Sequence, residues 1–252
     1  MGRTLVKLIS ETDGFTLTHG FERSDSPYLS TDSGELAAIG RNGVLVSDDI
    51  ASGTFDTLID FTTPETTLRN ANYCADSGKS MVIGTTGLTE SDRLVLEQHS
   101  RIIPIVFAPN MSVGVNLTFK LLELASKVLG TSADVEIIES HHKHKVDSPS
   151  GTALKMGEVV AESRGQELSG VGVFTRHGQT GPRPDGSIGF ATIRAGDIVG
   201  EHTVMFASEG ERIEISHKSS SRNNYAAGAI RATQWLEGRK SGLFSMHDVL
   251  GI

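Results

Sequence analysis

The residues best suited to chemistry lie in one short stretch, from Glu139 to Glu158. Its histidines and lysines are His141, His142, Lys143, His144, Lys145 and Lys155. An imidazole has an ordinary pKa of roughly 6.5, so it can give or take a proton near neutral pH. Ser150, Gly151 and Thr152 then open a predicted helix, whose first N–H groups and positive dipole end attract a carboxylate or phosphate. Proton donors beside an anion site indicate chemistry on a small acid.

Two other interpretations of this stretch stay open on the residues alone. A run of alternating His and Lys can be a solvated basic loop, with Ser150 as an ordinary helix N-cap. His141 and His144 lie three positions apart and could bind a metal. The chain has one cysteine, however, no HExxH pattern and no carboxylate at an obvious ligand spacing nearby. We therefore predict no metal site.

Composition narrows the class of protein. The 252 residues include 31 acidic and 23 basic side chains, a net charge of −8, which argues against a nucleic-acid partner. The single cysteine, Cys74, excludes an internal disulfide framework and fits a reducing compartment. No apolar run approaches the about 18 residues of a membrane span, and the N-terminus lacks the layout of a signal peptide. A cytoplasmic protein with no membrane association is the expectation.

The first half alternates strand-like and helix-like segments. Apolar runs of strand length are separated by helical stretches, one opening at Pro64 and ending near Gly78, another running from Thr89 to Ser100. This alternation predicts the doubly wound α/β class, a Rossmann-like parallel sheet with helices on both faces. The predicted strands are 15–21, 43–46, 57–61, 81–84 and 103–107.

Ligands of such sheets bind outside the carboxyl ends of the strands. Three predicted strand ends carry suitable residues: Glu22 with Arg23, Gly84–Thr86, and Ala108–Met111. An acidic residue in the place of Glu22 commonly bonds a ribose hydroxyl, and a neighbouring Arg accommodates a 2′-phosphate. The pair therefore suits either NADH or NADPH.

The second half has a different pattern. An apolar stripe at Val113, Leu117, Leu121, Leu124 and Val128 predicts a helix that Ser112 caps and Gly130 ends. Strand 135–138 leads into the histidines, and strands 171–174, 188–194, 202–207 and 212–217 lack intervening helices, which favours an antiparallel sheet. The helical period returns at about Asn223. We predict a split dinucleotide-binding domain, 1–112 plus 223–252, and an inserted mixed α+β domain, 113–222, for substrate binding and oligomerisation.

The stretch ESHHKHKVDSPSGTA, Glu139–Ala153, closely resembles the signature of the 4-hydroxy-tetrahydrodipicolinate reductase (dihydrodipicolinate reductase) family of lysine and diaminopimelate biosynthesis. The segments IDFTTPE, MVIGTTG, FAPNMSVGVN, GFATIRAGDIVGEHTVMF and GERIEISHKSSSR are similar to this family in the same order, so the resemblance covers essentially the whole chain. It implies an NADPH- or NADH-dependent oxidoreductase that reduces a cyclic dicarboxylate, built as a homotetramer.

The resemblance also implies residue roles. His141 matches the proton donor and acceptor, and Lys145 the second proton donor. The substrate-binding residues would be His142, Ser150, Gly151 and Thr152. The cofactor-binding residues would be Met1, Glu22, Arg23, Gly84, Thr85, Thr86, Ala108, Pro109, Asn110 and Met111.

The N-terminus departs from the family pattern. A dinucleotide fold opens with a strand and a glycine-rich turn, whereas here Met1 and Gly2 lead directly into a predicted helix at Thr4–Ile9. We expect a native chain longer by about 16 residues, the usual length of a strand plus turn. The alternative is a truncation that binds cofactor weakly. In that case the chain could be a non-catalytic homologue that binds a dicarboxylate without reducing it.

Overall fold

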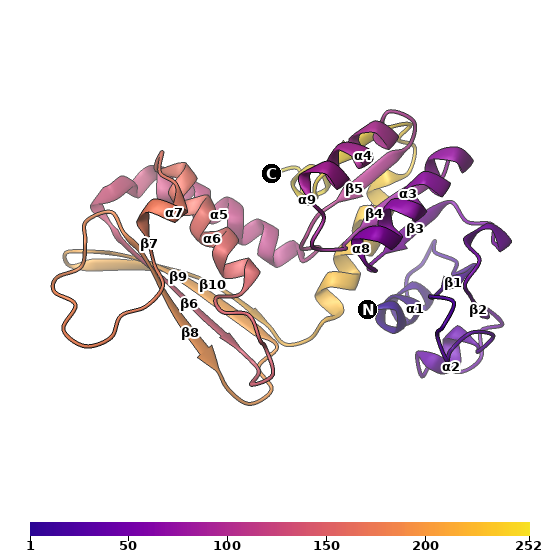
Figure 1. The fold of residues 1–252 in the computed structure, drawn as a ribbon, viewed down its shortest axis with the longest axis horizontal. Coiled ribbons are helices and arrows are strands. Elements are labelled where there is room, and N and C mark those ends of the chain that lie inside the picture. The colour runs from indigo at the N-terminus through magenta and orange to yellow at the C-terminus, as the bar shows by residue number, and fades with distance from the viewer. The chain divides into compact units, whose positions relative to one another are not determined.

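The chain folds into two compact units. The structure, a computed structural model, describes residues 1–252. The first unit comprises Met1–Val113 and Arg222–Ile252, and the second comprises Gly114–Ser221 (Figure 1). Hydrophobic clusters fill each unit separately. No helix is both long and apolar enough to cross a membrane.

A four-stranded parallel sheet forms the centre of the first unit. Its strands are β3 (Thr57–Asp60), β4 (Ser80–Ile83), β5 (Pro104–Phe107) and β11 (Gly242–Phe244), in the order β11-β5-β4-β3. Successive side chains of a strand point to opposite faces. Accordingly Val82 and Val106 enter one hydrophobic cluster, while Met81 and Ile105 enter another. The sheet is therefore buried on both sides, as its short, continuously apolar strands predict.

Helices cover both faces of this sheet. On one side lie α3 (Pro64–Ser77) and α4 (Glu90–Ser100), and on the other lie α1 (Gly2–Ser10), α8 (Asn223–Leu236) and α9 (Met246–Leu250). Local signals set the helix ends: Thr63 caps α3, Pro64 is its first residue, and Gly78 ends it at φ 65° in the left-handed region. The predicted doubly wound α/β class is confirmed.

The segment between α1 and β3 is only partly regular. It holds β1 (Gly20–Phe21) and β2 (Val46–Ser47), a parallel pair separate from the main sheet, with α2 (Ser33–Leu36) and the 3-10 turn η1 (Ile50–Ser52). The predicted strand 15–21 is wrong except for its last two residues. Residues 15–19 have no ladder partner; they line a cavity of about 810 Å³, together with the edge strand β3 and residues of α1 and α8.

The second unit contains a five-stranded sheet around β6 (Asp134–His141). The order is β10-β9-β6-β8-β7, with β7 (Gly172–Val173), β8 (Ile188–Arg194), β9 (Gly200–Ser208) and β10 (Glu211–Ser219). The sheet is mixed rather than antiparallel: β6, β8 and β7 run parallel, and β9 is antiparallel to β6 and β10. Parallel pairing needs a long crossover, which α6 (Gly151–Ser163) and α7 (Leu168–Val171) supply after β6.

Helix α5 (Val113–Leu129), followed by the 3-10 turn η2 (Gly130–Ser132), packs on this sheet through one of its two apolar faces. Its buried apolar residues are Val115, Phe119 and Leu122, which join β6, β8 and α6 in one cluster. The apolar stripe that indicated the helix in the sequence is exposed at Leu117, Leu121, Leu124 and Val128. Helix α5 is thus apolar on two sides, and the sheet covers only the side of Val115, Phe119 and Leu122.

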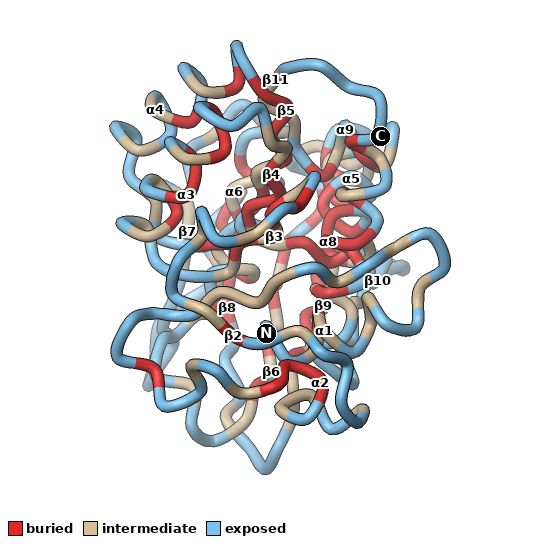
Figure 2. The backbone as a smooth tube through the Cα atoms, turned by 90° about the vertical axis from the view of Figure 1, so that its right-hand side faces the viewer, coloured by how far each residue is buried: buried red, intermediate tan, exposed pale blue.

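In the first unit, buried stretches lie on β4, β5 and α8 (Figure 2).

Candidate active site

Strand β6 carries the candidate catalytic side chains on its buried face. Burial alternates along the strand, so Glu139 and His141 point to the same side as Val135 and Ile137. The relative exposure is 1% for Glu139 and 8% for His141. The strand runs three residues beyond its predicted end at Ile138, which places His141 on the sheet rather than in a loop.

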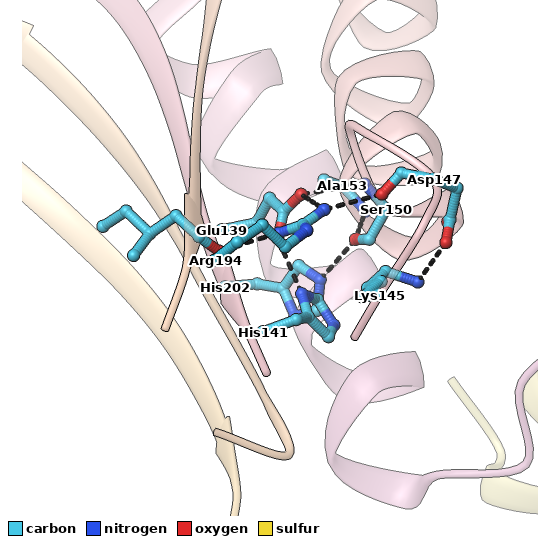
Figure 3. Close-up of polar contacts among 9 residues, drawn as sticks. Glu139, His141, Lys145, Asp147, Ser150, Ala153, Arg194 and His202 are labelled. Carbon is cyan, nitrogen blue, oxygen red and sulfur yellow. Dashed lines mark hydrogen bonds and ion pairs between the residues drawn. The ribbon is translucent and has the colours of Figure 1, made fainter. Parts of the chain in front are cut away.

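Every acceptor position of the Glu139 carboxylate is used (Figure 3). Oε1 accepts from Arg194 Nη2 at 2.7 Å and from the Ser150 N–H at 3.0 Å, while Oε2 accepts from Arg194 Nη1 at 2.7 Å. The second partner of Oε2 is His141 Nδ1, at 2.6 Å. Burial alone would raise the pKa of Glu139, but these hydrogen bonds outweigh it and hold the pKa below its ordinary value. Glu139 is therefore an ionised carboxylate inside the unit, and the guanidinium of Arg194 balances its charge.

His141 lies against two further groups on β9. Its ring makes an edge contact with the ring of His202, with centroids 5.1 Å apart. Gly200 leaves space at the other nitrogen, because a Cβ built there would lie 3.0 Å from Nε2. Burial lowers the pKa of His141, Glu139 opposes this, and the charges of Lys145 and Arg194 lower it further, so the net direction is down. His141 is thus a neutral imidazole at neutral pH.

Ser150 ties this cluster to the N-terminal end of α6. Its Oγ accepts the Ala153 N–H at 3.1 Å, which makes it the N-cap that the sequence predicts. The same Oγ lies 2.8 Å from His202 Nε2. Gly151 is exposed, and a Cβ built on it would meet nothing within 4 Å. The helix end is open beside a buried imidazole pair, an arrangement suited to holding an anion near a proton carrier.

The loop after β6 divides into residues that face this cluster and residues that do not. Lys145 is 21% exposed, donates to Asp147 at 2.8 Å and lies beside His141 and Ser150 in Figure 3. His142 is half-buried, and its Nδ1 is buried without a hydrogen-bond partner. Lys143 and His144 are exposed. The structure therefore brings His141, Lys145 and Ser150 together and leaves Lys143 and His144 outside the cluster.

Three residues of this site carry no role in the sequence-based prediction: Glu139, Arg194 and His202. Counting by two along β6 could have found Glu139, because it shares the buried face with Val135 and Ile137. Nothing local points to Arg194 or His202. They reach the site through β8 and β9, whose register sets Arg194 opposite His141 and His202 opposite Glu139.

In the first unit, two of the predicted cofactor segments follow neighbouring parallel strands. Gly84, Thr85 and Thr86 follow β4, whereas Ala108, Pro109, Asn110 and Met111 follow β5. Thr85 is 2% exposed, and its hydroxyl bonds Asp60 at 3.2 Å and Thr67 at 2.9 Å. Ala108 and Met111 are also buried, while Thr86 and Pro109 are exposed and Asn110 is half-buried. Thr85 thus secures the turn, and the exposed residues offer surface to a ligand.

The remaining predicted cofactor residues lie near α1 and β1. Glu22 follows β1 with an exposed side chain, and Arg23 pairs with Asp25 at 3.0 Å. Met1 is the N-cap of α1, whose first turn holds no acidic residue and carries Arg3. A positive helix end and an exposed carboxylate match the phosphates and the ribose of a dinucleotide. These residues fit a nicotinamide cofactor. No group of three or more His, Cys, Asp or Glu side chains is arranged to hold a metal ion.

Comparison with known proteins assigns the family. The family described as "Dihydrodipicolinate reductase, N-terminus" matches residues 1–111, and "Dihydrodipicolinate reductase, C-terminus" matches residues 114–250. The chain belongs to the dihydrodipicolinate reductase family. Membership makes it an oxidoreductase of the dehydrogenase and reductase type and supports a role in lysine and diaminopimelate biosynthesis.

Solved structures share the fold of this family member. A dipicolinate-bound dihydrodipicolinate reductase from Paenisporosarcina sp. TG-14 is 23% identical, with a TM-score of 0.74 over 97% of this chain and 92% of that chain. An amine dehydrogenase from Mycobacterium smegmatis is 11% identical, with a TM-score of 0.56 over 98% and 92%. GenD2 from gentamicin A biosynthesis, in complex with NAD, is 12% identical, with a TM-score of 0.57 over 99% and 87%.

Proposed function

We propose that this chain reduces 4-hydroxy-tetrahydrodipicolinate to tetrahydrodipicolinate. The reaction consumes NADPH or NADH and one proton and releases water and the oxidised cofactor. One observation carries the proposal: a buried imidazole, His141, lies beside Lys145 and the open N-terminal end of α6 within a member of this reductase family. A proton carrier next to an anion site is what reduction of a small diacid requires.

The substrate carboxylates are assigned to the N-terminal end of α6. Ser150, Gly151 and Thr152 form that end, and His142, whose half-buried ring has an unpartnered Nδ1, is assigned to the substrate as well. A charge-assisted hydrogen bond to a carboxylate is worth on the order of 1.5–3 kcal/mol. Because Ser150 also donates its N–H to Glu139, the anion site and the proton carrier share one anchor.

His141 and Lys145 are assigned to proton transfer. Negative charge develops toward the ring nitrogen of the substrate as ring carbon 4 is reduced, and a proton must neutralise it. Lys145 carries a proton as an ammonium group. His141 is neutral in the free protein, and the two negative charges of a bound dicarboxylate would raise its pKa and favour proton uptake.

The cofactor would be held by the first unit. Glu22 and Arg23 would contact its ribose and any 2′-phosphate, Met1 and the end of α1 its phosphates, and the turns after β4 and β5 its other end. When bound, a reduced nicotinamide supplies the hydride. Glu22 and Arg23 suit both forms of the cofactor, so the proposal includes both.

Steady-state kinetics with freshly generated substrate test the assignment of protons. We expect His141→Gln to lower kcat by about 100-fold or more while KM changes little, since the loss is that of a general acid–base group. His144→Gln is the matched control, because His144 is exposed on the same loop. Lys145→Met and its exposed control Lys143→Met repeat the comparison for the ammonium. An equal loss in His141→Gln and His144→Gln would remove His141 from catalysis.

One observation favours a second candidate function, dicarboxylate binding without reduction. Residues 15–19 stand apart from the main sheet across a cavity beside β3, so the cofactor unit lacks a continuous sheet between Glu22 and the turn at Gly84. Calorimetry with dipicolinate and absorbance of the reduced nicotinamide distinguish the two functions. Binding of dipicolinate without any oxidation of NADPH or NADH would favour the second.

We also propose that the chain assembles as a homotetramer. The face of the second-unit sheet opposite α5 and α6 presents three apolar side chains on adjacent strands, half-buried at Ile138 and Met205 and exposed at Ile193. An open sheet face of this kind can pack against another copy. Light scattering after size-exclusion chromatography measures the assembly directly, and a monomer mass of 26.9 kDa would contradict it.

A further inference from the structure

The bond between Glu139 and His141 determines where His141 carries its proton. An ionised carboxylate can only accept hydrogen bonds, and Glu139 Oε2 lies 2.6 Å from His141 Nδ1. The hydrogen between them therefore belongs to Nδ1. The lone pair of the neutral ring is then on Nε2, the nitrogen beside which Gly200 leaves space. A hydrogen bond at one ring nitrogen fixes the role of the other in this way.

Arg194 keeps Glu139 ionised and immobile. Its two terminal nitrogens grip both carboxylate oxygens at 2.7 Å, a bidentate geometry that adds orientation as well as charge. The same guanidinium donates to the backbone carbonyl oxygens of Ile193 and Asp147. Through Asp147 it also reaches the loop that carries Lys145. The carboxylate therefore has one orientation available, with Oε2 toward the imidazole.

We propose that Glu139, held by Arg194, is a positioning residue that fixes His141 in the Nδ1–H tautomer and reserves Nε2 for proton exchange. This rests on the proposed function only for the identity of the reaction. The tautomer itself is a property of the free protein. Glu139 does not contact the substrate in this scheme and acts through His141.

The charges around His141 make the two partners separable. Glu139 on β6 is negative, Arg194 on β8 is positive, His202 on β9 is uncharged at neutral pH, and Lys145 on the loop is positive and paired with Asp147. Removing the charge of Glu139 leaves positive neighbours and should lower the pKa of His141. Removing the charge of Arg194 leaves Glu139 unopposed and should raise it. These opposite signs show that both side chains act on the imidazole, and the tautomer of His141 then separates positioning from a purely structural role.

Nuclear magnetic resonance of the chain with ¹⁵N-labelled histidine tests the proposal without any assay of activity. The His141 signals are assigned by their absence in His141→Gln. We expect an Nδ1–H imidazole at neutral pH, a shift toward the Nε2–H form with a lower pKa in Glu139→Gln, and a higher pKa in Arg194→Met. Arg194→Lys is the second variant, for use if Arg194→Met folds poorly. It keeps the positive charge, so the pKa of His141 should stay near that of the parent.

The matched control is Glu201→Gln. Glu201 is a carboxylate on the adjacent strand β9, opposite Ser140 in register, and it pairs with Lys218 on the other face of the sheet. It should change neither the tautomer nor the pKa of His141. An Nε2–H imidazole in the parent chain overturns the proposal, as do pKa changes of the same sign in Glu139→Gln and Arg194→Met.

Kinetics connect the tautomer to the reaction. We expect Glu139→Gln to lower kcat by about 10- to 100-fold, the range found where a carboxylate that orients a metal-bound imidazole is removed. A loss of kcat in Glu139→Gln with an unchanged His141 tautomer would mean a structural role and overturn the proposal. If the parent chain reduces no substrate, the proposed function fails, whereas the tautomer measurement still decides the role of Glu139.

Discussion

Acid should destabilise the second unit through one buried side chain, His202. It is 5% exposed, and burial, reinforced by the neighbouring His141, lowers its pKa to about 4. In the unfolded chain the ordinary value of 6.5 returns. Because the folded pKa is the lower one, the unfolded chain takes up the proton first as pH falls. The stability that neutral His202 contributes is therefore complete above pH 6.5 and is lost on the way down to about pH 4.

The size of the effect follows from the two pKa values. At about 1.4 kcal/mol per pKa unit, the difference between 6.5 and about 4 amounts to about 3 kcal/mol at full protonation. At pH 5 the unfolded chain is almost fully protonated at this site while the folded chain is not, so about 2 kcal/mol should already be lost. Other groups that titrate in this range contribute equally to the parent and to a variant that changes only His202. The difference between the two proteins therefore isolates the effect of His202.

Urea unfolding at pH 7 and pH 5 measures this loss. His202→Gln retains an amide that can bond Ser150 but cannot titrate, so its loss between the two pH values should be smaller than the parent's by about 2 kcal/mol. His177→Gln, an exposed histidine of the same unit, should behave like the parent. Circular dichroism follows both units, and fluorescence of Trp235, the single tryptophan, follows the first. Equal losses in the parent and His202→Gln would refute the reasoning.

Two further changes test one site residue and one turn. Ser150→Ala removes the N-cap of α6 and a hydrogen-bond partner of buried His202, so we expect the free energy of unfolding to fall by about 1–2 kcal/mol. Calorimetry should also show several-fold weaker binding of dipicolinate. Unchanged binding would contradict the anion site. Gly84→Ala places a Cβ 2.2 Å from the Phe61 ring, so urea unfolding followed by Trp235 fluorescence should show a loss of about 1–3 kcal/mol. Gly2→Ala, with nothing within 4 Å, is its control and should show no loss.

Some features of the fold were predictable because their causes lie within a few residues. Thr63, Pro64 and Gly78 set the limits of α3, and Ser150 caps α6 as predicted. Short apolar runs between helices predicted the parallel sheet, and the order of motifs indicated the family. These signals are local, since a cap or a turn is determined by the chain immediately around it.

Other features were decided by partners that the sequence does not identify. Helix α5 is apolar on two sides, and only packing on β6 and α6 determines that Phe119 is buried while Leu124 is exposed. The strand pattern at 15–19 predicted pairing, yet those residues have no ladder partner. Periodicity gives the side on which a residue lies, whereas the neighbours decide which side is covered.

Local patterns along the chain were enough to predict the α/β class, the ends of α3, the start of α6 and the grouping of His141, Lys145 and Ser150 as candidate chemistry. Only the tertiary structure added Arg194 and His202 to that group. These two residues come from strands far along the chain, and the register of β8 and β9 against β6 sets them beside Glu139 and His141. A buried carboxylate has to be neutralised by whatever the fold brings next to it, and no local pattern encodes that partner.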